Sequence, residues 1–205
     1  MWEMILAGRY LMIPIGICSL VGLAVFIERV LVLRRNKVVV PEIAEAVETL
    51  SAGTDFSVAY AICQRRPGPF ANIVRAGLDH VDDDWQLTRD VLQEAGRQEA
   101  KRLNRHLNIL ETVAAVSPLL GLLGTVTGMI RTFAVVSQAG IGDPQQLSAG
   151  ISEAMITTAA GLIVGIPALV AHNWLTGRVD GLVFELEVYA TQIMDTLRDR
   201  RRART

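Results

Sequence analysis

Three long stretches without a charged side chain constrain this sequence more than any other feature. They are residues 10–27, 112–130 and 154–177. Each approaches or exceeds the ~18–20 apolar residues with which a helix crosses a ~30 Å hydrocarbon core. Because backbone groups in lipid must hydrogen-bond one another, such stretches are expected to be helical. The sequence therefore predicts an all-α membrane protein with three transmembrane helices, at roughly residues 11–33, 112–136 and 151–174.

The basic residues predict how the chain crosses the membrane. The loop at 137–150 has no Lys or Arg, whereas residues 34–105 and the tail ending in RDRRRART hold nearly all of them. Cytoplasmic flanks carry the Lys/Arg excess, so we expect the N-terminus outside and the C-terminus inside. The first stretch ends in Glu28-Arg29 instead of a small-residue cleavage site, which predicts a retained anchor. The predicted parts are 1–33 (outer N-terminus and first span), 34–108 (cytoplasmic helical domain), 109–136 (second span), 137–150 (outer loop), 151–174 (third span) and 175–205 (cytoplasmic amphipathic tail helix).

The cytoplasmic parts are predicted to be helical. Prolines and glycines delimit three short helices, with the sequences PEIAEAVETL, FSVAYAICQRR and FANIVRAGL. The acids at 82–84 mark the start of a long helix, which we expect to continue unbroken into the second span. The tail carries apolar residues every three or four positions, so it is predicted to pack on a neighbour as an amphipathic helix. These residues are Val179, Leu182, Leu186, Tyr189, Ile193 and Leu197.

Sequence signatures of catalysis and metal binding are missing. The stretch GLLGTVTG lacks the Lys-Ser/Thr ending of a phosphate-binding loop, and no His-Glu-x-x-His or paired-Cys spacing occurs. The histidines are scattered, and the two cysteines fit a reduced state. We therefore expect no enzyme activity, no cofactor, no metal and no nucleic-acid partner. The tail arginines are expected to contact anionic lipid head groups.

Small residues recur along the second and third spans. Lipid offers helices no hydrophobic reason to associate, so close approach through small residues drives their packing. The predicted packing positions are Gly121, Gly124, Gly128, Gly161 and Gly165. On the third span, Gly161 and Gly165 form a stripe with Gly150, Ala154 and Thr158.

A glutamate and several threonines stand out within these apolar spans. Glu153 lies near the outer end of the third span, and Thr158 lies about 7.5 Å deeper at ~1.5 Å per residue. Thr125 lies at a comparable depth on the second span, and Thr157 is a weaker candidate. Hydroxyls donate and accept hydrogen bonds without titrating near pH 7, so these residues could line a proton path or merely pack. Intramembrane acids are functional candidates, but Glu153 could equally form an interhelical ion pair with Arg131.

The acids in the spans are too few for a complete proton path in one chain. Glu28 and Glu111 lie at the cytoplasmic ends of their spans. An acidic side chain that carries the proton in the middle of the membrane would therefore have to come from another protein. Three helices also provide too few walls for a pore, which predicts self-association.

The stretches VSPLLGLLGTVTGMIRTF and GISEAMITTAAGLIVGIPALVAHNW strongly resemble the ExbB/TolQ/MotA proton-channel family, in particular its ExbB/TolQ branch. The resemblance implies a homopentamer in the bacterial inner membrane around an ExbD/TolR-like single-span partner dimer, which supplies an aspartate. A TonB/TolA-like protein could be a further partner. The resemblance also implies that Thr125 and Thr158 are pore hydroxyls and that Glu153 is the pore-side acid. Thr157 is not at the family position, and Arg131 is outside the motif.

This resemblance predicts a motor subunit that couples the proton motive force to mechanical work on the partner. The alternative function is a structural membrane scaffold without proton conduction, in which the threonines pack and Glu153 pairs with Arg131. A passive solute channel is less favoured, because only one acid faces the predicted bundle.

Overall fold

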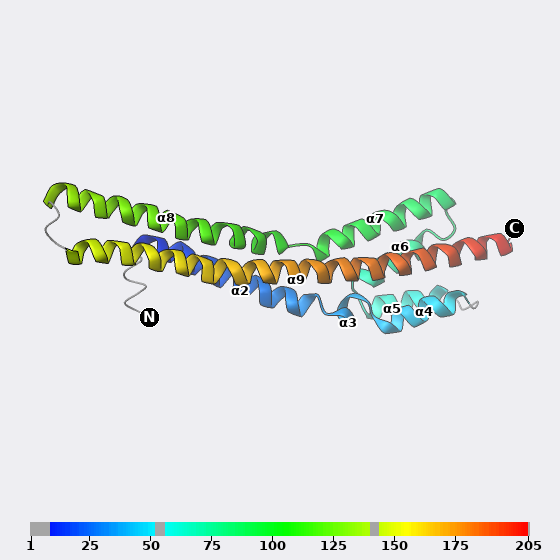
Figure 1. Cartoon of the computed structure of the whole chain (residues 1–205). Helices are drawn as coiled ribbons and strands as arrows, with labels where there is room; N and C mark the ends of the chain where they lie inside the picture. Colours follow the sequence, from blue (N-terminus) through cyan, green and yellow to red (C-terminus); the bar gives the residue numbers. More distant parts are fainter. Residues whose placement is uncertain (1–8, 52–55, 140–143, 205) are drawn as a thin grey trace. The chain divides into compact units, whose positions relative to one another are not determined.

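The computed structural model describes residues 9–51, 56–139 and 144–204 (Figure 1). These residues contain helices and no strand, so the predicted all-α class is confirmed. The helices are α2 (Arg9–Val32), α3 (Arg35–Val38), α4 (Pro41–Ser51), α5 (Phe56–Arg65), α6 (Pro69–Asp79), α7 (Trp85–Leu103), α8 (Leu107–Ala139) and α9 (Pro144–Arg204).

Three helical segments are long and apolar enough to cross a membrane, as predicted. They lie within Tyr10–Val32, Trp85–Ala134 and Gly150–Asp199. Large apolar side chains such as Leu20, Phe133 and Ile163 are exposed along them. A continuous apolar surface of this kind is rare on soluble proteins and suits contact with lipid.

The chain divides into two compact units. The bundle unit comprises Met1–Arg29 and His106–Leu175, and the tail unit comprises Val30–Arg105 and Thr176–Thr205. The bundle unit contains most of α2, all of α8 and the N-terminal part of α9. The tail unit contains α3 to α7 and the C-terminal part of α9. Most of the uncharged sequence therefore belongs to the bundle unit, and most of the charged sequence to the tail unit.

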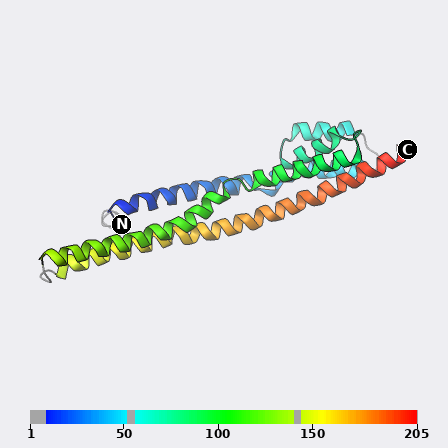
Figure 2. The ribbon, with the colours of Figure 1, turned by 90° about the horizontal axis from the view of Figure 1, so that it is seen from above.

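In the bundle unit, α8 and the N-terminal part of α9 run side by side in opposite directions (Figures 1 and 2). Helix α2 joins this pair at Gly22, where an added methyl group would lie 3.3 Å from Val113 Cγ1 on α8. His172 on α9 places its Nδ1 3.1 Å from the carbonyl oxygen of Leu107 on α8. The bundle unit is thus a three-helix arrangement in which every helix contacts α8.

In the tail unit, the predicted short helices are present. Pro41 and Pro69 are the first residues of α4 and α6, and the Asp84 carboxylate accepts the Gln86 N–H at 3.1 Å, capping α7. The ring of Phe70, which is fully buried, lies 4.8 Å from that of Tyr189 on α9. The other predicted apolar positions of the tail, Val179, Leu182, Leu186, Ile193 and Leu197, are buried. The tail helix therefore packs on helices of its own chain.

Cys63 on α5 is buried in the tail unit, and this burial raises the pKa of its thiol to about 11. Only the thiolate reacts readily, so we expect a water-soluble maleimide to label Cys63 slowly at pH 8 and faster as the pH approaches 11. The labelling rate of a Cys18→Ser variant, measured against pH, checks this. Unfolding in detergent should make labelling fast, whereas fast labelling of the folded protein at pH 8 would contradict the burial.

The predicted unbroken helix from residues 82–84 into the second span is wrong. α7 ends at Leu103 and α8 begins at Leu107, and between them His106 adopts a φ of 68°. Residues other than glycine rarely take positive φ, although histidine does so more often than most. The apolar spacing continues across the break, which is why periodicity alone missed it. The third span and the tail, by contrast, form one continuous helix, α9.

Candidate functional site

The contact between α8 and α9, here called the seam, is built from glycines. A methyl group at Gly161 would lie 2.5 Å from the Ser117 carbonyl oxygen, and one at Gly121 would lie 3.0 Å from Thr158 Cα. These are backbone atoms, so the helices could not give way locally. All five glycines proposed for packing lie at this seam: Gly121, Gly124, Gly128, Gly161 and Gly165. The close approach brings polar groups of the two helices within reach of one another.

Thr157 lies at the centre of the seam. It is 2% exposed, it contacts Gly124, and its hydroxyl donates to the Ala154 carbonyl at 2.8 Å. The sequence pattern placed Thr158 in the stripe of small residues on the third span. In the structure, Thr157 occupies the buried row with Ala154 and Gly161, and Thr158 lies at the edge of the seam. The hydroxyl of Thr157 is satisfied inside its own helix, so this residue serves packing.

The hydroxyls of Thr158 and Thr125 are half-buried. Thr158 Oγ1 donates across the seam to the Gly121 carbonyl at 3.0 Å, and Thr125 Oγ1 donates to the Leu122 carbonyl at 2.7 Å. A hydroxyl that donates its proton keeps two lone pairs that can accept. Both groups can therefore still receive a hydrogen bond from water or from a partner's side chain.

Glu153 and Arg131 form an ion pair between α9 and α8. Arg131 Nη1 lies 3.2 Å from Glu153 Oε1, and the two side chains are 49% and 25% exposed. The helices are held close at this level, because the Gly150 backbone contacts Thr132, which is buried. The interhelical pair considered from the sequence is thus present, and Glu153 has a cationic partner within its own chain.

The ion pair and the two hydroxyls lie on different sides of the seam. Arg131 lies 18 residues after Val113 on α8, and Glu153 lies 18 residues before Ala171 on α9. Eighteen residues make five whole turns at 3.6 residues per turn. Arg131 therefore points to the same side of α8 as Val113, and Glu153 to the same side of α9 as Ala171. Because Val113 and Ala171 face α2, the ion pair lies on the α2 side. Thr158 is about 140° around α9 from Glu153 at ~100° per residue. The structure therefore brings Thr125 and Thr158 to the side away from α2 and keeps Glu153 apart from them.

A second polar cluster lies at the other end of α8, and the sequence did not single it out. Arg29 is only 5% exposed, and its Nη2 donates to Glu28 Oε1 at 2.6 Å. His106 Nδ1 lies 3.2 Å from Glu28 Oε2. The charges that end the first apolar stretch were a signal for Arg29 and Glu28. Nothing in the sequence pointed to His106, because its role depends on the break before α8.

Ser117 on α8 is a further buried polar residue at the seam. It is fully buried, and its Oγ has no hydrogen-bond partner within the described part of the chain. Its own carbonyl oxygen is the atom that faces Gly161. The small size of both residues allows the two backbones to approach, which is sufficient reason for a serine at this position.

The sequence model of the MotA/TolQ/ExbB proton channel family matches residues 65–188, a range that includes all the candidate residues on α8 and α9. An ExbB-like biopolymer transport protein of Synechocystis sp. is 34% identical over 178 residues, covering 83% of this chain and 68% of the relative. The Tol-Pal system protein TolQ of Pseudomonas aeruginosa is 31% identical over 167 residues, covering 73% and 71%. TolQ of Haemophilus influenzae is 35% identical over 113 residues, covering 55% and 50%.

Proposed function

Because the chain belongs to the MotA/TolQ/ExbB proton channel family, in its ExbB/TolQ branch, and is a multi-pass inner-membrane protein, we propose that it forms the proton-conducting wall of a motor. Copies of the chain assemble as a ring, a homopentamer, around the single-span helices of an ExbD/TolR-like dimer. The N-terminus lies in the periplasm and the C-terminus in the cytoplasm, in keeping with the Lys/Arg excess of residues 34–105 and of the tail.

The observation that carries this proposal is the side of the seam on which Thr125 and Thr158 lie. No helix of the bundle unit, as far as it is described, covers that side, and its apolar residues are exposed: Leu122, Ile151, Leu162 and Leu169. An apolar wall with two hydroxyls that can accept hydrogen bonds suits the lining of a narrow conduit. Water and a partner's carboxylate could both approach these hydroxyls there.

The ring supplies what one chain lacks. Within one chain, Glu153 and Thr158 lie on different sides of the seam, so a path between them has to run through the assembly. The described spans also hold no acid near their middle, and the partner's carboxylate is proposed to carry the proton there. One proton crossing 100 mV releases ~2.3 kcal/mol, and this is the energy that each proton can supply for mechanical work.

Reconstitution of the complex tests this function. The chain is purified with the membrane protein that accompanies it, and the native mass of the complex is measured. We expect five copies of this chain with two copies of a smaller single-span protein. In liposomes, an imposed potential should drive proton uptake through this complex. A monomer, or a complex without proton uptake, would contradict the proposal.

Glu153→Gln is expected to lower proton uptake by roughly tenfold or more while the ring stays assembled. Glu153 is the titratable acid that this chain contributes to the proposed path, and a lost interaction of 1.4 kcal/mol is already a factor of ten in rate. Proton flux in liposomes and native mass together measure this. Glu42→Gln, at an exposed position in the tail unit, is the matched control and should leave both unchanged.

The double variant Arg131→Gln/Glu153→Gln separates conduction from packing. Glu153→Gln alone leaves Arg131 without its partner, and the second change removes this stranded charge. We expect the double variant to regain thermal stability without regaining proton uptake. Full recovery of both would instead support the scaffold function, in which the ion pair only holds α8 against α9.

A further inference from the structure

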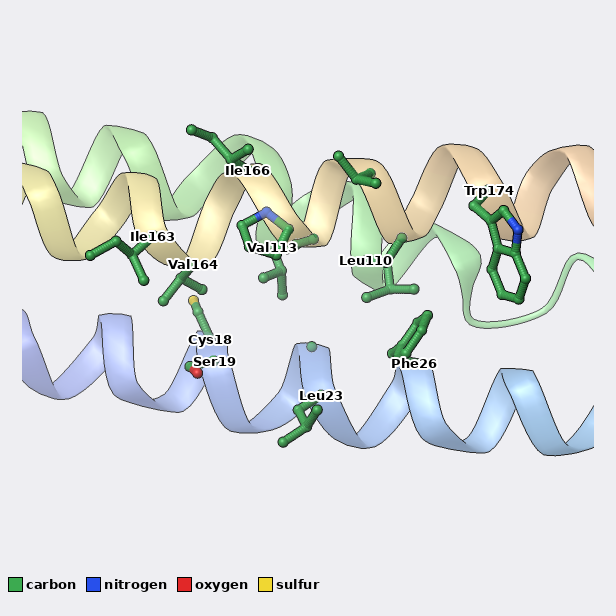
Figure 3. Close-up of a pocket in the computed structure, with 15 residues that line it drawn as sticks. Cys18, Ser19, Leu23, Phe26, Leu110, Val113, Ile163, Val164, Ile166 and Trp174 are labelled. Atoms are coloured by element: carbon green, nitrogen blue, oxygen red, sulfur yellow. The ribbon is translucent and has the colours of Figure 1, made fainter.

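A groove of about 460 Å³ lies between α7 and α9 in the tail unit. Its floor is apolar, with Leu92 and Leu186, and exposed charged residues line it: Arg89 and Arg97 on α7 and Glu187 on α9. The cavity between α2 and α9 in the bundle unit has no charged side chain in its lining (Figure 3), so that lining does not select one occupant over another. The charges of the tail groove can select one.

A separate face of α9, here called the α9 face, is apolar and exposed on the tail unit. Phe184 and Val188 are 66% and 43% exposed. At ~100° per residue, Val188 and the exposed Asp195 lie within about 40° of Phe184 around the helix axis. Leu186 and Ala190, which line the groove, lie about 120–160° away from Phe184. One chain therefore carries two different surfaces, and exposed apolar side chains beside charged ones are typical of interaction sites.

The groove and the α9 face are complementary in charge. Arg89 in the groove and Asp195 on the α9 face have no ion-pair partner within the residues that the structure describes. The other exposed apolar position on α7, Leu87, is flanked by the acids Asp84 and Asp90. Like charges disfavour a contact, so the charges direct the α9 face to the groove and away from the other side of α7.

The two surfaces also match along the helix axes. A methyl group at Gly77 on α6 would lie 2.7 Å from Leu92 Cδ1 and 3.3 Å from Ile193 Cγ2, so Leu92 and Ile193 lie at the same level. Because α7 and α9 run in opposite directions in the tail unit (Figures 1 and 2), each step forward along α7 corresponds to one step back along α9. Gly96 therefore lies at nearly the level of Val188.

A ring whose axis runs along these helices keeps each residue at its own level. Phe184 of one copy then reaches the level of Ala100 in the next copy, and Asp195 reaches that of Arg89. The groove has room here, because a methyl group added to Gly96 meets no atom within 4 Å. The large side chains of the α9 face thus meet the small residues of the groove, and the opposite charges meet each other.

We propose that the α7–α9 groove of each copy binds the α9 face of the next copy. A contact between two different surfaces forms a closed ring when its rotation closes. This proposal rests on the ring put forward under the proposed function, and it names the surfaces through which the tail units of that ring join.

Cysteine cross-linking of the purified complex tests this contact. The chain carries Cys18→Ser, whereas Cys63 is buried and stays unreactive at neutral pH. Val188→Cys combined with Gly96→Cys should give a ladder of covalently linked copies with a short bis-maleimide, because each copy contributes both sides of a head-to-tail contact. Val188→Cys combined with Gln98→Cys is the matched control. Gln98 is exposed at a similar level, about 200° around α7 from Gly96, and this pair should give no ladder.

Charge reversal gives an independent readout. Arg89→Glu should lower the ladder yield about two- to fivefold, as expected for an exposed ion pair, and Asp195→Arg in the same chain should restore it. A ring of normal native mass without the ladder would overturn the contact and leave the proposed function standing. A ladder from the Gln98→Cys pair, or a cross-link from Gly96→Cys to a smaller protein, would do the same. A monomer would overturn both proposals.

Discussion

Thr158→Val is expected to reduce proton uptake by the reconstituted complex roughly 10- to 100-fold without preventing assembly. Valine matches threonine in shape but cannot accept a hydrogen bond. A hydrogen bond to a charged group contributes ~1.5–3 kcal/mol, and each 1.4 kcal/mol added to a barrier slows the step tenfold. The measurement is proton flux into liposomes under an imposed potential, with native mass as the check on assembly.

The neighbouring residue provides a matched control for this prediction. Thr157→Val makes the same chemical change one position earlier, where the hydroxyl bonds only to its own helix and is buried at the seam. We expect near-normal proton uptake from Thr157→Val. If both variants conducted normally, Thr158 would be a packing residue and the proposed lining would be wrong. If Thr157→Val alone lost activity, the two roles would have to be exchanged.

Gly161→Leu is expected to abolish assembly of the bundle. Overpacking of a close contact typically costs ~1–3 kcal/mol, and more where nothing can move. At Gly161 even a methyl group meets the Ser117 carbonyl at 2.5 Å and the backbone of Gly121 at about 3 Å. Separating the helices would also remove the Thr158–Gly121 hydrogen bond. Thermal stability in detergent and size-exclusion chromatography should both show the loss.

Gly177→Leu is the control for this substitution. Gly177 lies on the same helix, but an added side chain there meets no atom within 4 Å. Leucine is also a better helix former than glycine, by up to ~1 kcal/mol. We expect an assembled complex of equal or higher stability. A normally assembled Gly161→Leu complex would show that α8 and α9 do not approach each other as described.

Local sequence patterns were enough to predict most of the helices. The apolar stretches indicated the spans, Pro41 and the acids at 82–84 marked the starts of α4 and α7, and spaced apolar residues predicted the buried face of the tail. The glycines suggested close packing between the second and third spans. These predictions succeeded because each depends on residues within a few turns of one another, and helical periodicity alone relates their positions.

The break at His106 and the shift of the buried row from Thr158 to Thr157 were not predictable in this way. The left-handed backbone of His106 accompanies a contact with Glu28, which is distant in the sequence. The position of the buried row depends on the rotation of α9 about its own axis. A rotation of one residue, about 100°, changes which threonine faces the neighbouring helix while leaving the apolar pattern almost unchanged.

The sequence by itself determined that this chain is a helical membrane protein with two glycine-lined spans, one acid and several hydroxyls among them. Only the tertiary structure decided that Glu153 pairs with Arg131, that the hydroxyls of Thr125 and Thr158 lie on the opposite side, and that α2 and α9 enclose a cavity. The physical reason is that periodicity sets which residues share a face of one helix. Which face meets which partner depends on the summed packing of all three helices.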